Sequence, residues 1–193
     1  ADTFMSYDLP WANASNTPFK LFKHWTHEGG IATPFIAHWP AGIAAGQRVT
    51  SPAHLIDVMA TCVDVADTPY PSEYDGNAIQ PLQGESFRPA FSDDQWSRER
   101  EIFWEHEGNL AVRQGNWKLV RKFPGDWELY DMDEDRTELD DLAGKLPDKI
   151  AELRGLYDNW AANSRVIPWD EILDLPKMAP TKLRLYSTLA YKK

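Results

Sequence analysis

Residues 101–132 decide the fold, and they read EIFWEHEGNLAVRQGNWKLVRKFPGDWELYDM. Four short runs in this stretch are strand-like, at residues 101–106, 109–114, 117–123 and 127–132. Gly108, Gly115-Asn116 and Pro124-Gly125 separate the runs, and these residue types favour tight turns between antiparallel strands. The stretch therefore predicts a small antiparallel sheet.

A helix is predicted on the C-terminal side of this sheet. Pro147 and Asp148 are typical of the first turn of a helix. The apolar residues that follow share one stripe at helical spacing: Ile150, Leu153, Leu156, Tyr157 and Trp160. We expect this helix to cover one face of the sheet. We expect the Pro-rich residues 164–193 to be extended.

The sequence before the sheet has a different pattern. Residues 1–30 are loop-like, and the run from Ile31 to Trp39 reads as a buried strand. Ser51 and Pro52 then predict the start of a helix, with Ser51 as its N-cap. One apolar face of that helix contains Leu55, Met59, Cys62, Val63 and Ala66. A strand followed by a helix suits the edge of an α/β layer structure.

Residues 67–98 separate these two regions. They contain four prolines and two glycines, which leave little room for regular elements. We therefore predict an irregular connection here and a boundary between subdomains.

The composition excludes some classes of partner. The formal net charge of −10 argues against nucleic acid or an anionic membrane surface as the partner. No apolar run approaches the roughly 20 residues that a membrane-spanning helix needs. Cys62 is the single cysteine, which excludes an internal disulfide and a cysteine-rich zinc site.

The candidate chemistry lies in residues 16–40. Lys20, Lys23, His24 and His27 fall within eight residues and could meet an anion. Loops held at the end of a core strand often carry functional groups. The alternative is a solvated basic loop beside a strand, and composition alone leaves both interpretations open.

Two motifs in this order resemble the sulfatase family, arylsulfatase-type enzymes of the alkaline phosphatase superfamily. The first is Lys23-x4-Glu28-Gly29-Gly30-Ile31-x2-Pro34, followed by His38-Trp39-Pro40. The second is Ala111-Val112-Arg113-x2-Asn116-Trp117-Lys118-Leu119-Val120, followed by Glu128-Leu129-Tyr130-Asp131. The resemblance covers residues 5 to 163 and concerns the C-terminal portion of those enzymes.

The resemblance implies an α+β fold in four parts. Residues 1–66 would be the end of a sulfatase-like α/β domain, and residues 67–98 the irregular connection. Residues 99–163 would be a small antiparallel-sheet subdomain with its C-terminal helix, and residues 164–193 an extended tail.

The resemblance also implies a role for one residue. In sulfatases the lysine five residues before the Glu of Glu-Gly-Gly contacts the sulfate ester, and here that lysine is Lys23. His24, His27 and His106 are possible pocket residues. His27 could orient the loop or the leaving group, or make a structural hydrogen bond. His106 could line the pocket, or simply pair with the carboxylates beside it.

The nucleophile and the metal ligands of a sulfatase are not identified in this sequence. Sulfatases use a formylglycine made within a Cys/Ser-x-Pro/Ala-x-Arg motif, and Val-Asp-Val-Ala follows Cys62 instead. We therefore expect the formylglycine and the ligands of the family's calcium to lie outside this chain. Asp131-x-Asp133-x-Asp135 resembles the opening of a calcium loop, but Arg136 stands where that loop needs a glycine. We expect a solvated acidic turn there and no metal site in this chain.

These observations predict the C-terminal part of a sulfuric ester hydrolase that is inactive by itself. Its partners would be a sulfate ester and the missing N-terminal part of the same enzyme. The alternatives are a non-catalytic sulfatase-like module and a part of a related phosphonate or phosphodiester hydrolase. Family resemblance favours a periplasmic or secreted bacterial protein.

Overall fold

The computed structural model of the protein describes residues 8–173 of the 193-residue chain. These residues form two compact units. The first unit contains residues 8–32, 103–112 and 117–173, and the second contains residues 33–102 and 113–116. The start of the chain therefore packs with the sheet region, although the two are far apart in sequence. The predicted four-part division concerns the domains of a larger protein and stays a prediction.

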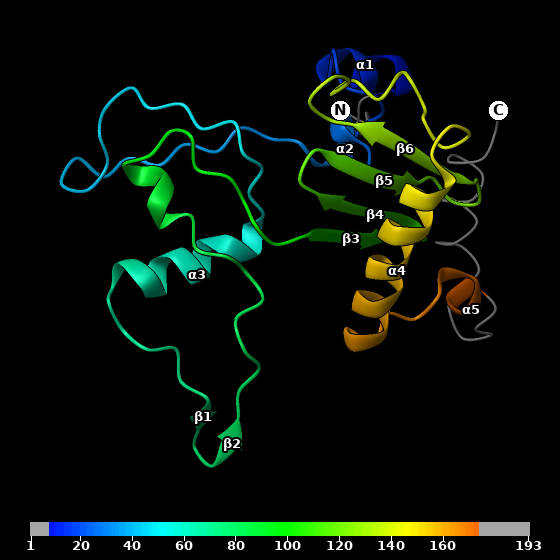
Figure 1. Ribbon diagram of the computed structural model, residues 1–193. Helices are drawn as coiled ribbons and strands as arrows, with labels where there is room; N and C mark the ends of the chain where they lie inside the picture. The colour runs from blue at the N-terminus through cyan, green and yellow to red at the C-terminus, as the bar shows by residue number, and fades with distance from the viewer. Residues whose placement is uncertain (1–7, 174–193) are drawn as a thin grey trace, which may run out of the picture. The chain divides into compact units, whose positions relative to one another are not determined.

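The sheet of the first unit has four antiparallel strands in the order β3-β4-β5-β6 (Figure 1). Their bounds are Ile102–His106 for β3, Asn109–Gln114 for β4, Trp117–Arg121 for β5 and Trp127–Asp131 for β6. In the last pair Leu119 lies opposite Leu129, and Lys118 opposite Tyr130. The turn between β3 and β4 has positive φ at Glu107 and Gly108, as the favoured two-residue hairpin turn requires. The predicted sheet is confirmed.

One face of the sheet packs against α4, which spans Pro147–Asn163. Figure 1 shows this helix lying across the strands. The buried core between them contains Val112, Leu119, Leu129, Leu153 and Tyr157. Ile150, Leu156 and Trp160 pack around that core, so the predicted helix and its apolar stripe are confirmed.

The opposite face of the sheet also has a buried cluster, formed by Ala111, Val120, Tyr130 and Met132. Two short helices precede the sheet in the first unit, α1 at Leu9–Ser15 and α2 at Glu28–Ile31. The prediction that residues 1–30 are loop-like is therefore wrong at these two places. Pro10 stands in the first turn of α1, where its fixed φ suits a helix and its missing N–H is not needed.

The second unit contains α3, Leu55–Val65, which begins later than predicted. The N-cap is His54, not Ser51. The His54 ring accepts from the backbone of the first turn, and Asp57 accepts from the His54 backbone N–H in return. The predicted apolar face is also not the buried one. Asp57, Ala60 and Thr61 are buried, whereas Leu55 is 83% exposed.

Residues 31–39 do not form the predicted buried strand. Their first residue ends α2, and the rest have no regular structure. Ile36 is 88% exposed, and Phe35 and Trp39 are exposed as well. A buried strand needs neighbours that pair its backbone and cover its side chains. Within residues 8–173 no strand pairs with this run.

Residues 67–98 are largely irregular, as predicted. They contain a short hairpin, β1 Glu73–Tyr74 with β2 Asn77–Ala78, and a 3₁₀ turn, η1, at Arg88–Phe91. The expected extended tail, residues 164–193, contains a short helix, α5, at Trp169–Leu173, and residues 174–193 lie outside the described residues.

None of the helices within residues 8–173 has the length and apolar character needed to cross a membrane.

Candidate active-site loop

Residues 19–31, here called the lysine loop, lie against the face of the sheet that α4 does not cover. The Thr26 hydroxyl donates a hydrogen bond to the Leu110 carbonyl over 3.1 Å. Lys20 donates to the Glu128 carboxylate over 2.8 Å and to the Tyr130 hydroxyl over 3.1 Å. The loop is therefore attached to both β4 and β6.

The two glycines of the lysine loop allow its backbone to fold tightly onto itself. A Cβ atom on Gly29 would lie 2.1 Å from the Leu21 carbonyl oxygen. A Cβ atom on Gly30 would lie 1.9 Å from the Trp25 carbonyl oxygen. Both contacts are with backbone atoms, which cannot rotate away as a side chain can. Only glycine fits these positions without a shift of the loop.

A buried charged cluster fixes the C-terminal end of the lysine loop. The Lys118 ammonium is fully buried and lies 2.8 Å from Glu28 and 2.7 Å from Glu138. Glu138 also accepts the backbone N–H of Glu28 over 2.9 Å. Arg136 lies 3.8 Å from the other Glu28 oxygen. Buried charges are tolerated when they are paired and hydrogen-bonded in this way, so Glu28 holds the loop in place.

The Glu128 carboxylate of β6 holds the middle of the lysine loop. Besides the bond from Lys20, it accepts a hydrogen bond from the Tyr130 hydroxyl over 2.5 Å and lies 3.3 Å from His27 Nε2. Burial raises the pKa of Glu128, but hydrogen bonds from His27, Lys20 and Tyr130 outweigh it and lower that pKa to about 2. The group is therefore a carboxylate at neutral pH. Burial raises the pKa of Tyr130, and the hydrogen bond to Glu128 raises it further, so the hydroxyl keeps its proton.

The predicted site residues take different positions within this framework. Lys23 is exposed, and no carboxylate within residues 8–173 lies at ion-pair distance from its ammonium. His27 is fully buried and bound to Glu128, with its Nδ1 atom unpartnered among the described residues. Of the charged groups at residues 20–28, Lys23 is therefore the one presented to solvent without a counter-ion there.

Two of the predicted pocket residues, His24 and His106, lie next to each other. Their ring centroids are 5.2 Å apart, and His24 Nδ1 lies 3.2 Å from Glu107. Burial lowers the pKa of His24, the Glu107 carboxylate raises it and His106 lowers it, with a net decrease. His24 has a φ of 109°, which is strained for a residue with a side chain. The fold thus holds His24 beside the β3–β4 turn.

The acidic run after β6 does not fit a calcium ion. Both Asp135 oxygens accept backbone N–H groups, including those of Thr137 and Leu139. Asp131 accepts the N–H of Asp133 in the same way. These oxygens therefore organise a turn and are not left free to surround a cation. Arg136, next in the chain, faces Glu28 and the Phe19 ring.

Sequence reasoning did not find Lys118, Glu138 or the partners of Glu128. Lys118 gives a local signal, because it is a charged residue inside an otherwise apolar strand run. A charge at such a position calls for a buried partner. The identity of that partner depends on which segments the fold brings together.

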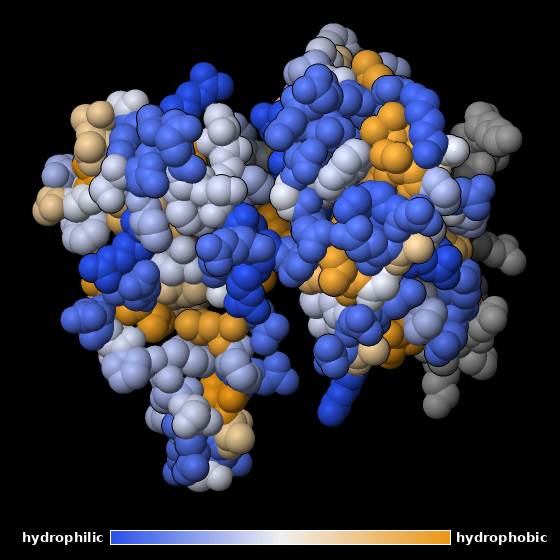
Figure 2. All heavy atoms as spheres, viewed as in Figure 1, coloured by the Kyte–Doolittle hydropathy of each residue, from blue (hydrophilic) through white to orange (hydrophobic). Residues whose placement is uncertain are grey.

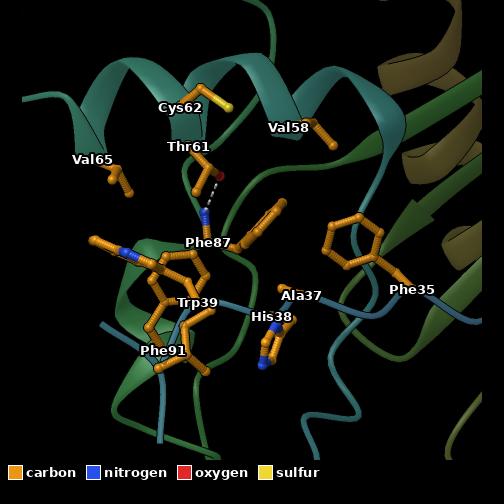
Figure 3. Close-up of a pocket in the computed structure, with 11 residues that line it drawn as sticks. Phe35, Ala37, His38, Trp39, Val58, Thr61, Cys62, Val65, Phe87 and Phe91 are labelled. Carbon is orange, nitrogen blue, oxygen red and sulfur yellow. Dashed lines mark hydrogen bonds between the residues drawn. The ribbon is translucent and has the colours of Figure 1, made fainter. Parts of the chain in front are cut away.

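The second unit carries an apolar pocket beside α3. Figure 3 shows Trp39, Phe87 and Phe91 gathered on one side, with Val58 and Cys62 of α3 on the other. Thr61 accepts the backbone N–H of Phe87 over 3.0 Å, which fixes this end of the pocket. Figure 2 shows hydrophobic side chains at the surface of this unit. Cys62 is exposed there.

The chain matches a family model that describes the C-terminal region of N-sulphoglucosamine sulphohydrolase, over residues 19–154. It is 29% identical over 178 residues to an uncharacterised sulfatase of Schizosaccharomyces pombe, which covers 86% of this chain and 31% of that protein. It is 39% identical over 128 residues to N-acetylgalactosamine-6-sulfatase of Rattus norvegicus, which covers 63% of this chain and 22% of that protein. The chain therefore spans a third or less of the length of these two relatives.

The fold also matches solved structures. The crystal structure of Ps i-CgsB aligns over 92% of this chain and 38% of its own, with a TM-score of 0.65 and 22% sequence identity. This match supports the arrangement of sheet and helices described above.

Proposed function

This chain belongs to the sulfatase family, and we propose that it supplies Lys23 as a sulfate-contacting residue of a sulfuric ester hydrolase. The observation that carries the proposal is the exposure of Lys23 on a loop whose other charged residues are tied to the sheet. Lys20, His27 and Glu28 are all paired with residues of the first unit. Lys23 remains available for an anionic ligand from outside the described residues.

The chemistry of a lysine suits this role. A compact ammonium offers three donors to the oxygens of a sulfate ester. In the transition state of hydrolysis, negative charge increases on the leaving-group oxygen as its bond to sulfur breaks. A cation positioned in advance lowers the barrier because it interacts more strongly with that charge than with the ground state.

The rest of the reaction depends on sequence outside this chain. The described residues offer no formylglycine motif at Cys62 and no fit for calcium at Asp131, Asp133 and Asp135. We therefore propose that the nucleophile and the calcium ligands belong to the N-terminal part of the same enzyme. On this proposal the 193-residue chain does not hydrolyse sulfate esters by itself.

The apolar surface of the second unit supports a large partner of this kind. Its pocket is lined by aromatic residues, and Ile36, Leu55 and Met59 are exposed nearby along the chain. Large exposed apolar patches mark interaction sites in soluble proteins. Because the chain spans 31% of the length of the Schizosaccharomyces pombe sulfatase, we propose that the remainder of the enzyme covers this surface.

The test of the lysine role is Lys23→Ala in the complete enzyme. We expect kcat/KM for an aryl sulfate to fall by roughly 10²- to 10³-fold, the usual effect of removing one donor to developing negative charge. Lys145→Ala is the matched control, because Lys145 is an exposed lysine that pairs with Asp140 and lies outside the lysine loop. A Lys23→Ala enzyme with near-normal kcat/KM would exclude the role.

The same enzyme preparation distinguishes the remaining functions. Faster hydrolysis of an aryl sulfate than of the matching aryl phosphate supports a sulfatase, and the reverse order supports a phosphonate or phosphodiester hydrolase. A complete reading frame without a formylglycine motif would indicate a non-catalytic module.

A further inference from the structure

We propose that His24, His106 and Glu107 form a binding site for a divalent transition metal such as Zn²⁺. Each of the three residues offers one ligand atom, and these atoms all lie within 4.8 Å of one another. The group comes from two distant parts of the sequence, the lysine loop and the β3–β4 turn. No step of the proposed sulfate chemistry uses it, so the inference stands apart from the role of Lys23.

The distances agree with a shared metal ion. Zinc binds imidazole nitrogen and carboxylate oxygen at about 2.0–2.2 Å, so ligand atoms around a tetrahedral ion lie about 3.3 Å apart. His24 Nδ1 and the Glu107 oxygen are 3.2 Å apart. The His24 and His106 rings are nearly perpendicular, at 78°. A cation would occupy the space that these donors surround, in place of the present contact between His24 and Glu107.

The scaffold holds the three ligands in place without a metal. Asn109 donates to the His106 carbonyl over 2.9 Å and lies 3.4 Å from the His24 carbonyl, so one amide links both histidine backbones. The other end of that amide accepts the Phe123 N–H over 3.1 Å. Asn109 is itself buried. A fixed set of donors loses little conformational entropy when it binds an ion.

The turn that carries Glu107 is equally constrained. Glu107 has a φ of 52° and Gly108 a φ of 79°, and a Cβ on Gly108 would lie 2.8 Å from the Phe123 ring. The Gly108 N–H donates to Glu105 over 3.0 Å. Positive φ at both positions is what the favoured two-residue hairpin turn requires, so the turn has one defined conformation. The Glu107 carboxylate of this turn lies 3.2 Å from His24 Nδ1.

The donor set selects the class of metal. Two imidazoles and one carboxylate suit zinc, copper and nickel, whereas calcium and magnesium prefer shells made only of oxygen. Three protein ligands leave a fourth position open, as in zinc sites that bind water or a ligand. The net charge of the chain, −10, adds a favourable long-range field for a cation.

The experiment is a calorimetric titration of the metal-free, tag-free 193-residue chain with Zn²⁺. Circular dichroism spectra check that each variant is folded. We expect one saturable equivalent for the unaltered chain. His106→Ala and Glu107→Gln should each weaken that binding by at least tenfold, because each removes a ligand. Co²⁺ in place of Zn²⁺ should give visible absorption bands of four-coordinate geometry that both variants lose.

His38→Ala is the matched control, because His38 is an exposed histidine in the second unit and lies outside the cluster. Its affinity for Zn²⁺ should equal that of the unaltered chain. Absence of saturable binding to the folded chain would overturn the proposal. Binding that survives both His106→Ala and Glu107→Gln would overturn it as well. Neither result bears on the Lys23→Ala test in the complete enzyme.

Discussion

Lys118 is the residue on which the lysine loop depends most directly. Its ammonium is buried between Glu28 of the loop and Glu138, which follows β6. Breaking such a cluster by removing its cation typically costs about 3–5 kcal/mol, because two buried carboxylates lose the ammonium that they share. The ion pair with Lys118 gives a structural role to Glu28, the first residue of the Glu-Gly-Gly motif. It carries the loop and does not reach toward Lys23.

Gly30 gives a sharp test of the loop at the same scale. Gly30→Ala should destabilise the chain by about 1–3 kcal/mol, because its Cβ would overlap the Trp25 carbonyl and the loop must shift. The measurement is the midpoint of urea unfolding.

Gly155→Ala serves as the control for that substitution. Gly155 lies inside α4, and a Cβ there meets nothing within 4 Å. Alanine should stabilise that helix by about 0.5–1 kcal/mol, since it loses less conformational entropy than glycine on folding. Equal effects of the two substitutions would contradict the close backbone approach at Gly30.

At the scale of elements, α4 shows a simple relation between pattern and packing. Its apolar stripe was predicted from helical spacing, and the same stripe covers the sheet. Leu153 is fully buried between Val112, Leu119 and Leu129. Because the helix carries many charged residues on its other sides, this one stripe supplies most of its attachment.

We expect Leu153→Ala to lower the free energy of unfolding by about 2–5 kcal/mol, through lost burial and the cavity left behind. Leu139→Ala, at an exposed leucine, should change it by less than about 0.5 kcal/mol. The comparison is made by urea unfolding of both variants under one set of conditions. A small loss at Leu153 would mean that α4 is not packed on the sheet in solution.

The helix α3 shows where pattern alone is insufficient. Its buried side contains Asp57, whose carboxylate pairs with Arg98 and accepts the backbone N–H groups of His54 and Glu85. A polar face is buried here because later segments of the second unit supply its partners. The apolar side, with Leu55 and Met59, is left exposed in this chain.

At the scale of the whole molecule, the second unit carries more of the exposed large apolar side chains of residues 8–173 than the first unit does. Ile36 and Leu55 of the second unit are both more than four-fifths exposed. If the remainder of the enzyme covers this surface, the same residues are buried in the complete protein. The two forms of the protein then respond differently to one substitution.

We expect Ile36→Ser to leave the 193-residue chain within about 0.5 kcal/mol of its original stability, as for other exposed positions. In the complete enzyme it should cost roughly 2 kcal/mol or more, because burial of the apolar side chain is lost. Thermal unfolding of both forms provides the measurement. Leu139→Ser in the first unit tests whether the effect is specific to the second. An Ile36→Ser enzyme as stable as its parent would argue against the covered surface.

Local pattern was sufficient for the sheet and for α4 of the first unit. The alternation of strand runs and turn residues in residues 101–132 determined four strands within one or two residues at each end. The spacing of apolar residues determined α4 and the face that it buries. Both signals succeed because hairpins and amphipathic helices are formed by neighbours in sequence.

Only the tertiary structure decided which distant residues meet. Lys118 pairs with Glu28, and His24 groups with His106 and Glu107, so segments more than 80 residues apart in sequence come together. A charged residue inside an apolar run indicates that a partner is needed, but the packing of the loop on the sheet determines which residue that partner is. The exposure of residues 31–39 has the same origin. An apolar run is buried only where other elements supply the surface that covers it.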